Sequence, residues 1–83
     1  MTTPTTPGHR RTKAETYFAA ICRHAAHRGA TWAEVAAELA AYTTEEWGAL
    51  VPHAAEPGPT MRARLRSVVQ VLADVDAEVE ARR

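Results

Sequence analysis

The chain has 83 residues with ten basic and ten acidic side chains, so its formal net charge is zero. A neutral chain of this length is expected to form one domain, without overall electrostatic attraction to nucleic acid or to a membrane surface. Its one cysteine, Cys22, excludes an intrachain disulfide and is typical of the reducing cytosol. We find no long apolar run and no signal-peptide pattern, so the sequence predicts a cytoplasmic protein.

The N-terminal segment is rich in threonine and proline. Residues 1–9 hold no cluster of apolar side chains, and they are predicted to form a disordered tail before a single helical domain at residues 10–83. A short basic cluster of Arg10, Arg11 and Lys13 follows the tail. It is interpreted as the solvated entry to a helix, with a phosphate-binding arm as the alternative. Arginine outnumbers lysine nine to one, which is typical of a GC-rich bacterial genome.

Three Thr–Glu pairs with the spacing of a capping box predict the starts of three helices. They are Thr12 with Glu15, Thr31 with Glu34, and Thr43 with Glu46. Gly29 is expected to end the first helix, and Pro52 to end the third near Leu50. The side chains expected to face the core are Ala14, Phe18, Ile21 and Ala25 with Tyr17 and Cys22 beside them, then Trp32, Val35, Ala36, Leu39 and Ala40, then Trp47, Leu50 and Val51.

The last segment, residues 60–83, is predicted to be one long helix capped by Thr60. Its apolar residues alternate in steps of four and three, which is the spacing of a heptad seam. The seam consists of Met61, Leu65, Val68, Leu72, Val75 and Val79. Val69 and Val71 widen it in the middle. The four predicted elements indicate an all-α fold, a small bundle of three to four helices with a long C-terminal helix.

Charges on this last helix run against its macrodipole, which favours acids at the N-terminus and cations at the C-terminus. Arginines 62, 64 and 66 lie at its start, and acids 74, 76, 78 and 80 lie towards its end. The plainer interpretation is that the seam forms the core of the chain itself. The alternative is an antiparallel homodimer centred on Gln70. Its facing charge pairs would be Arg62 with Asp76 and Arg64 with Glu78.

Residues that could carry chemistry are few. Cys22 and His24 would point about 200° apart on a helix, so they cannot share a metal ion. His24 and His27 share a helix face, but no further ligand stands at a metal-site spacing. Ser67, the only serine, has no nucleophile elbow around it. We therefore expect no catalytic residue, no cofactor and no metal, and a protein that is not an enzyme.

The middle of the chain is acidic and aromatic. Residues 29–61 contain five glutamates and neither lysine nor arginine. Such a surface suits a basic protein partner, and both tryptophans could instead belong to the core. The predicted protein-binding residues are Glu34, Glu38, Tyr42, Glu45, Glu46 and Trp47.

The stretch RGATWAEVAAELA at residues 28–40 resembles the first helix of bacterial helix-turn-helix proteins. The resemblance implies a DNA-binding regulator, in which the next helix reads bases. Residues 41–53 depart from that pattern, because they lack a glycine at the turn and any lysine or arginine. DNA binding would have to use cations elsewhere, namely Arg10, Arg11, Lys13, Arg23 and Arg28 together with arginines 62, 64 and 66.

These observations favour a non-catalytic protein-interaction module of regulatory or accessory type. It would use the acidic helical hairpin and the heptad-patterned C-terminal helix. A helix-turn-helix DNA-binding regulator is the alternative.

Overall fold

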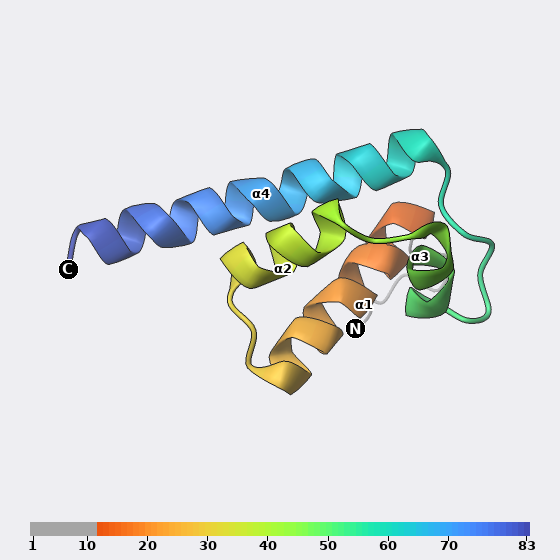
Figure 1. Ribbon diagram of the computed structural model, residues 1–83, viewed down its shortest axis with the longest axis horizontal. Coiled ribbons are helices and arrows are strands. Elements are labelled where there is room, and N and C mark those ends of the chain that lie inside the picture. Colours follow the sequence, from red (N-terminus) through yellow and green to blue (C-terminus); the bar gives the residue numbers. More distant parts are fainter. Residues whose placement is uncertain (1–11) are drawn as a thin grey trace, which may run out of the picture.

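The computed structural model describes residues 12–83, which form four helices and no strand within that range (Figure 1). The helices are α1 (Lys13–Arg28), α2 (Trp32–Ala40), α3 (Thr44–Leu50) and α4 (Pro59–Ala81). The predicted all-α fold with a long C-terminal helix is therefore confirmed. The predicted tail at residues 1–9 lies outside the described residues, as do Arg10 and Arg11.

All three predicted capping boxes form. In each box the threonine hydroxyl accepts a hydrogen bond of 3.1 Å from the backbone N–H of the glutamate. The glutamate carboxylate accepts one of 2.8 Å from the backbone N–H of the threonine. Gly29 ends α1 in the left-handed conformation with φ of 67°, and α3 ends at Leu50. The local starts and stops of α1 to α3 thus follow from short-range chemistry.

The start of α4 differs from the prediction. The helix begins at Pro59, and Gly58 is its N-cap residue without a side-chain hydrogen bond. Thr60 is therefore in the first turn and does not cap the helix. Proline fits the first helical position because its fixed φ is already helical and its missing N–H would have no intrahelical partner.

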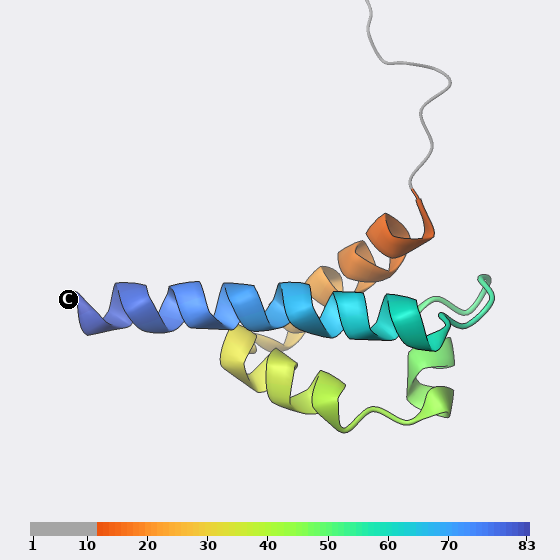
Figure 2. The same ribbon diagram turned by 90° about the horizontal axis from the view of Figure 1, so that it is seen from above.

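Helix α4, with 23 residues, runs across the other helices along the length of the molecule (Figure 1). Seen from above, α1 and α2 leave α4 on opposite sides, and α3 lies close to the N-terminal end of α4 (Figure 2). The most extensive packing of α4 is with α2. The C-terminal end of α4 projects past both neighbours, and every residue from 74 to 83 is exposed. We call residues 74–81 the overhang.

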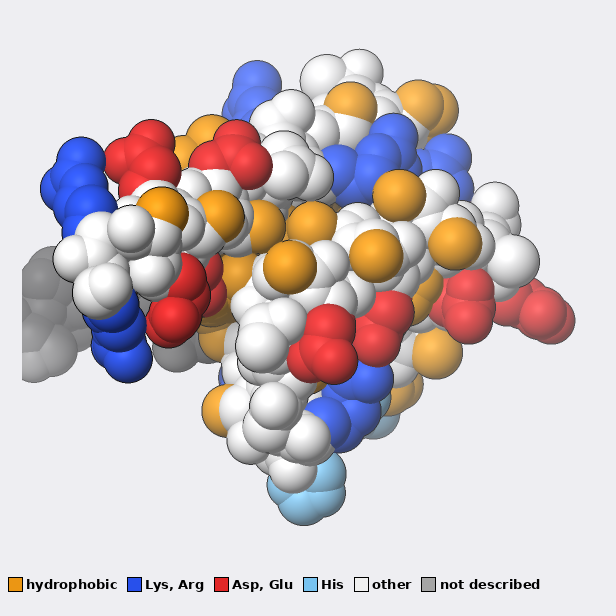
Figure 3. Space-filling view, turned by 60° about the vertical axis from the view of Figure 1, so that its left-hand side comes forward, with side chains coloured by type: hydrophobic (Ala, Val, Ile, Leu, Met, Phe, Trp, Pro, Cys, Tyr) orange, Lys and Arg blue, Asp and Glu red, His pale blue; other side chains and the backbone are white. Residues whose placement is uncertain are grey.

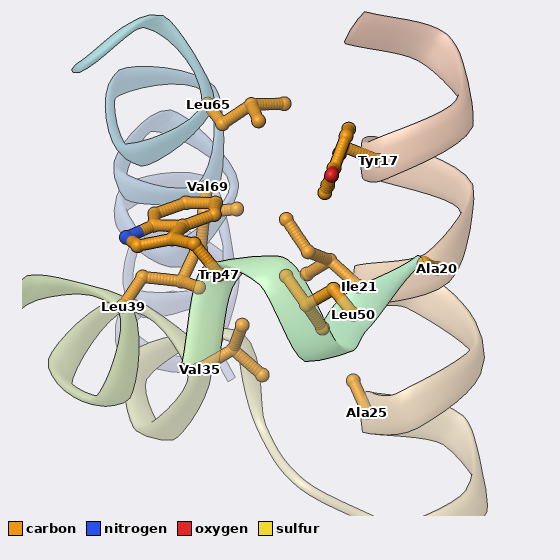
Figure 4. Close-up of a cluster of buried hydrophobic side chains, with 10 residues drawn as sticks. All are labelled: Tyr17, Ala20, Ile21, Ala25, Val35, Leu39, Trp47, Leu50, Leu65 and Val69. Carbon is orange, nitrogen blue, oxygen red and sulfur yellow. The ribbon is translucent and has the colours of Figure 1, made fainter. Parts of the chain in front are cut away.

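The core lies where all four helices meet (Figure 4). Its buried side chains are Tyr17, Ala20, Ile21, Ala25, Val35, Leu39, Trp47, Leu50, Leu65 and Val69. The buried face of α1 is turned slightly from the predicted one. Tyr17 and Ala20 are buried, whereas Ala14 and Phe18 are only half-buried.

Tyr17 also explains how the linker before α4 is held. Its hydroxyl donates a 2.8 Å hydrogen bond to the backbone oxygen of Ala55, and the Lys13 ammonium donates one of 3.3 Å to that of Glu56. Burial, and secondly the charge of Glu56, raises the pKa of Tyr17. The linker is thereby fastened to the first turns of α1.

Candidate interaction surface

The face of α4 that packs on its own chain is made by Leu65, Val69 and Ala73, which are spaced four residues apart. A row with that spacing forms a ridge that fits between the side chains of a neighbouring helix. Of the predicted seam, Met61 and Leu65 pack in the core, and Leu72 is half-buried. The core of the chain therefore uses a row rotated from the predicted seam, and much of that seam is not covered.

Four valines of α4 are left on the surface. Val68 is 41% exposed, Val71 59%, Val75 50% and Val79 47%, and they are the large hydrophobic side chains exposed within residues 12–83. Steps of three and four residues place them along one side of the helix. We call these four residues the valine stripe. Val71 was not assigned to the predicted seam, although its position beside the seam was a usable signal.

An apolar groove between α1 and α4 continues the valine stripe. It is a hollow of about 280 Å³, lined by Ala14, Glu15, Phe18, Ala19, Arg64, Leu65 and Val68. The Phe18 ring stacks on Trp32 with 6.3 Å between ring centroids and 2° between planes. Both rings are only half-buried. We call this hollow the α1–α4 groove; sequence reasoning missed it because its walls come from two distant segments.

On its other side α4 meets the alanine-rich surface of α2. Figure 3 shows hydrophobic side chains along the groove between α2 and the C-terminal part of α4, with acidic side chains on both sides. Ala33, Ala36, Ala37 and Ala40 line it, together with Ala73 and Ala77. Ala73 is buried against α2, whereas Ala33, Ala37, Ala40 and Ala77 are exposed in the groove.

Trp47, the tryptophan predicted for the acidic contact face, is buried in the core. Trp47 is 0% exposed and lies among Leu39, Val69 and the other core residues (Figure 4). It therefore cannot touch a partner on the surface. Tyr42 is half-buried and packs edge-on against Trp47, with 5.4 Å between ring centroids. The indole N–H of Trp47 has no hydrogen-bond partner among the described residues.

Three of the four glutamates predicted for that face have structural partners in the chain. Glu34 and Glu46 complete capping boxes. Glu38 accepts two hydrogen bonds from Arg28, of 2.7 and 2.8 Å. The first and largest cause of the lowered pKa of Glu38 is this hydrogen bonding. Glu45 is exposed. The acidic hairpin is thus largely explained by capping and by the α1–α2 ion pair.

The cations proposed for nucleic acid make contacts in several parts of the fold within residues 12–83. Arg28 is paired with Glu38 at the far end of α1, and Lys13 contacts the linker at the near end. Arg62 donates a 3.4 Å hydrogen bond to the Thr44 hydroxyl, beside α3. Arg64 lines the α1–α4 groove instead. Helix α3, in the place of a recognition helix, carries two glutamates and neither lysine nor arginine.

The remaining polar candidates do not form a reactive site in the described part of the chain. Arg23, His24 and His27 line a shallow hollow at the end of α1. No group of three or more His, Cys, Asp or Glu side chains suited to a metal ion occurs in residues 12–83. Cys22 is half-buried, and burial raises the pKa of its thiol.

Comparison with known proteins adds no relative, because no family model, curated protein or solved structure matches the chain. None of the four described helices combines the length and apolar composition needed to cross a bilayer. The valine stripe and the α1–α4 groove together form an exposed apolar surface on residues 12–83.

Proposed function

We propose that the chain is a non-catalytic protein-interaction module of regulatory or accessory type that acts in the cytoplasm. Its binding surface is the valine stripe together with the α1–α4 groove. One observation carries the proposal: the large exposed hydrophobic side chains of residues 12–83 all lie on one side of α4. Single exposed hydrophobic residues are common, whereas a contiguous apolar patch is typical of an interaction site.

Burial of this patch would contribute to the free energy of association with a partner. Burying a fully exposed valine side chain stabilises by about 1.5 kcal/mol or more, so a half-exposed one contributes about 1 kcal/mol. The four valines and the half-buried Phe18 would together offset part of the entropic cost of association. A water-exposed surface of this kind favours a partner that brings its own apolar side chains.

The charges around the patch have both signs. Arg64 borders the α1–α4 groove, and Glu78 is exposed on the overhang. The partner therefore meets an apolar surface with a cation towards one end and an acid towards the other. This modifies the expectation of a uniformly basic partner at the hairpin, where most glutamates serve the fold.

Helix-turn-helix DNA binding is the alternative proposal. Its support is the resemblance at residues 28–40, and the turn at residues 41–43 does separate two helices. The pairing of Arg28 with Glu38 and the acidic α3 count against it, since phosphate contacts require a basic surface.

The two proposals are separated by a pull-down from lysate of the source organism, with and without nuclease. The baits are the wild type, a Val71→Asp/Val75→Asp variant, and a control Ala63→Asp/Ala81→Asp. Ala63 and Ala81 are exposed on α4 away from the stripe, so the control adds the same charges elsewhere.

We expect a stoichiometric protein that survives nuclease, is lost with the valine variant and is kept by the control. Recovery of nucleic acid, or of proteins released by nuclease, would favour the DNA-binding alternative. Equal recovery by the valine variant would place the binding surface elsewhere.

A further inference from the structure

We infer that the occupant of this surface is a second copy of the chain, bound antiparallel through α4 with the two-fold axis beside Val71. This inference rests on the proposed function, whose partner it names. In the dimer, the overhang of each copy lies against the α1–α4 groove of the other.

The overhang is the first reason to expect a contact. Residues 74–83 are exposed and form a regular helix as far as Ala81, with one side bordering a groove beside Thr31 and Ala33 of α2 and the turn before it. A helix end that makes few packing contacts opens locally more readily than the packed part of the same helix. Val75 and Val79 add half-exposed apolar surface to this segment, and Val79 also borders the groove beside Thr31 and Ala33. Packing against a neighbouring surface would hold this end of the helix in place and would remove its apolar side chains from water.

The second reason is that the central three valines of the stripe approximate the symmetry of a two-fold contact. Val68 lies three residues before Val71, and Val75 lies four residues after it. Rotation about an axis beside Val71 places Val68 opposite position 74 of the second copy, one residue or about 1.5 Å from its Val75. Val71 then lies beside its own counterpart, as the centre of an isologous contact requires.

Charge complementarity selects this arrangement. Arg64 lies seven residues before Val71, and Glu78 lies seven residues after it. Because seven residues make about two turns, all three share one flank of α4. The two-fold axis brings Arg64 of each copy to Glu78 of the other, twice in the dimer. A parallel pairing would instead place arginine against arginine and glutamate against glutamate.

A shifted antiparallel pairing is disfavoured by the same charges. An axis between Ala73 and Asp74 would also match the valines, with Val68 opposite Val79. It would however crowd acids 74, 76 and 78 of both copies around the axis, where like charges repel. With the axis beside Val71, the acidic half of each helix faces the basic half of the other. The antiparallel helices also align the macrodipoles favourably.

Of the two charge pairs expected from the sequence, the structure favours Arg64 with Glu78 over Arg62 with Asp76. Arg62 contacts Thr44, and Asp76 lines a groove with Thr31 and Ala33 of the same chain. Both lie seven residues, or about two turns, from the buried Val69, so they share the face of α4 that packs on its own chain. Arg64 and Glu78 lie on the open flank, so theirs is the pair that a second copy can use. Glu78 also lies 3.9 Å from Arg82 of its own chain. That ion pair is long and exposed, so it competes only weakly with the proposed pairing of Glu78 with Arg64.

The test is sedimentation equilibrium of the full chain over a hundredfold range of concentration at low salt. We expect the mass to rise from 9.1 kDa towards twice that value. Arg64→Glu and Glu78→Arg should each weaken association about tenfold, since each replaces two attractive contacts by two repulsive ones. The double variant Arg64→Glu/Glu78→Arg should return to near the wild-type constant.

Glu80→Arg is the matched control, because Glu80 lies on the same end of α4 but lines the groove beside α2. It should leave association unchanged, and circular dichroism should show equal helicity for all variants. A mass of 9.1 kDa at every concentration would overturn the inference. Failure of the double variant to recover, or equal weakening by Glu80→Arg, would overturn the register. If the chain stays monomeric yet the pull-down recovers a partner that needs Val71 and Val75, the proposed function stands and the second copy does not.

Discussion

Arg28 and Glu38 form a bidentate ion pair in which the two guanidinium nitrogens lie 2.8 and 2.7 Å from the two carboxylate oxygens. The pair joins the last residue of α1 to the last turns of α2, across the turn at residues 29–31. Both side chains stay partly exposed, at 44% and 40%, so the pair joins the two helices at the surface of the fold.

This pair predicts a dependence of stability on pH. The hydrogen bonds from Arg28 hold the pKa of Glu38 below its ordinary value of 4.5. A carboxylate with a lowered pKa in the folded state stabilises the fold above 4.5, and that contribution is lost as the pH falls through the folded-state pKa. Urea unfolding midpoints should therefore fall more steeply below that pH in the wild type than in Glu38→Gln. Glu45→Gln, at an exposed glutamate of α3, is the control and should follow the wild type. Identical acid profiles of the wild type and Glu38→Gln would contradict the role of this pair.

The linker hydrogen bond predicts the effect of Tyr17→Phe. This change keeps the buried ring but removes the 2.8 Å bond to the Ala55 carbonyl. The free energy of unfolding should fall by about 1–2 kcal/mol, because a part-buried acceptor loses its partner. Tyr42→Phe removes a hydroxyl without a hydrogen bond to the described residues, so it should cost less. Denaturant titration distinguishes the two, and an equal loss would mean that the Tyr17 hydroxyl contributes no specific bond.

Trp47 predicts an unequal response to two truncations. Its indole N–H is buried without a partner in the described structure, which costs about 1–3 kcal/mol. Trp47→Phe removes that N–H together with some volume, so the two effects partly cancel. Trp47→Ala leaves a large cavity and should cost about 3–5 kcal/mol. Trp32→Phe, at the half-buried stacked ring, is the control and should cost little. An equal loss in the free energy of unfolding for Trp47→Phe and Trp47→Ala would refute this explanation.

Two glycines predict opposite responses to alanine. Gly29 has φ of 67° and open space around its Cα, so Gly29→Ala suffers backbone strain alone. We expect a loss of about 1 kcal/mol. Gly48 lies inside α3, where an added Cβ would make only ordinary contact at 3.4 Å with Glu56. Gly48→Ala should therefore stabilise by about 0.5–1 kcal/mol. Thermal unfolding of the two variants measures both effects, and a shared sign would contradict the account.

The features predicted correctly from the sequence are those set by neighbours in the chain. The Thr–Glu spacing of each capping box and the position of Gly29 determine where α1 to α3 begin and where α1 ends. The start of α4 was misplaced because two local signals compete. Thr60 can cap a helix, but Pro59 occupies the first helical position and leaves Thr60 inside the first turn.

The features that the sequence did not reveal depend on packing between distant segments. The apolar surface of α4 is wide enough for two rows, the predicted seam and the row of Leu65, Val69 and Ala73. Only the position of α2 decides which row is buried and leaves Val71 and Val75 exposed. Trp47 was open to the same ambiguity, since a tryptophan on a short helix suits either a core or a contact surface.

The antiparallel contact through α4 is tested most directly by cysteine cross-linking at the axis. In a Cys22→Ser background, Val71→Cys would bring two thiols together, because residue 71 lies beside its counterpart. Val79→Cys would hold its thiols about 24 Å apart along the helices, far beyond the reach of a disulfide. Mild oxidation should therefore give a covalent dimer with Val71→Cys and none with Val79→Cys. Cross-linking of both variants, or of neither, would contradict the antiparallel dimer.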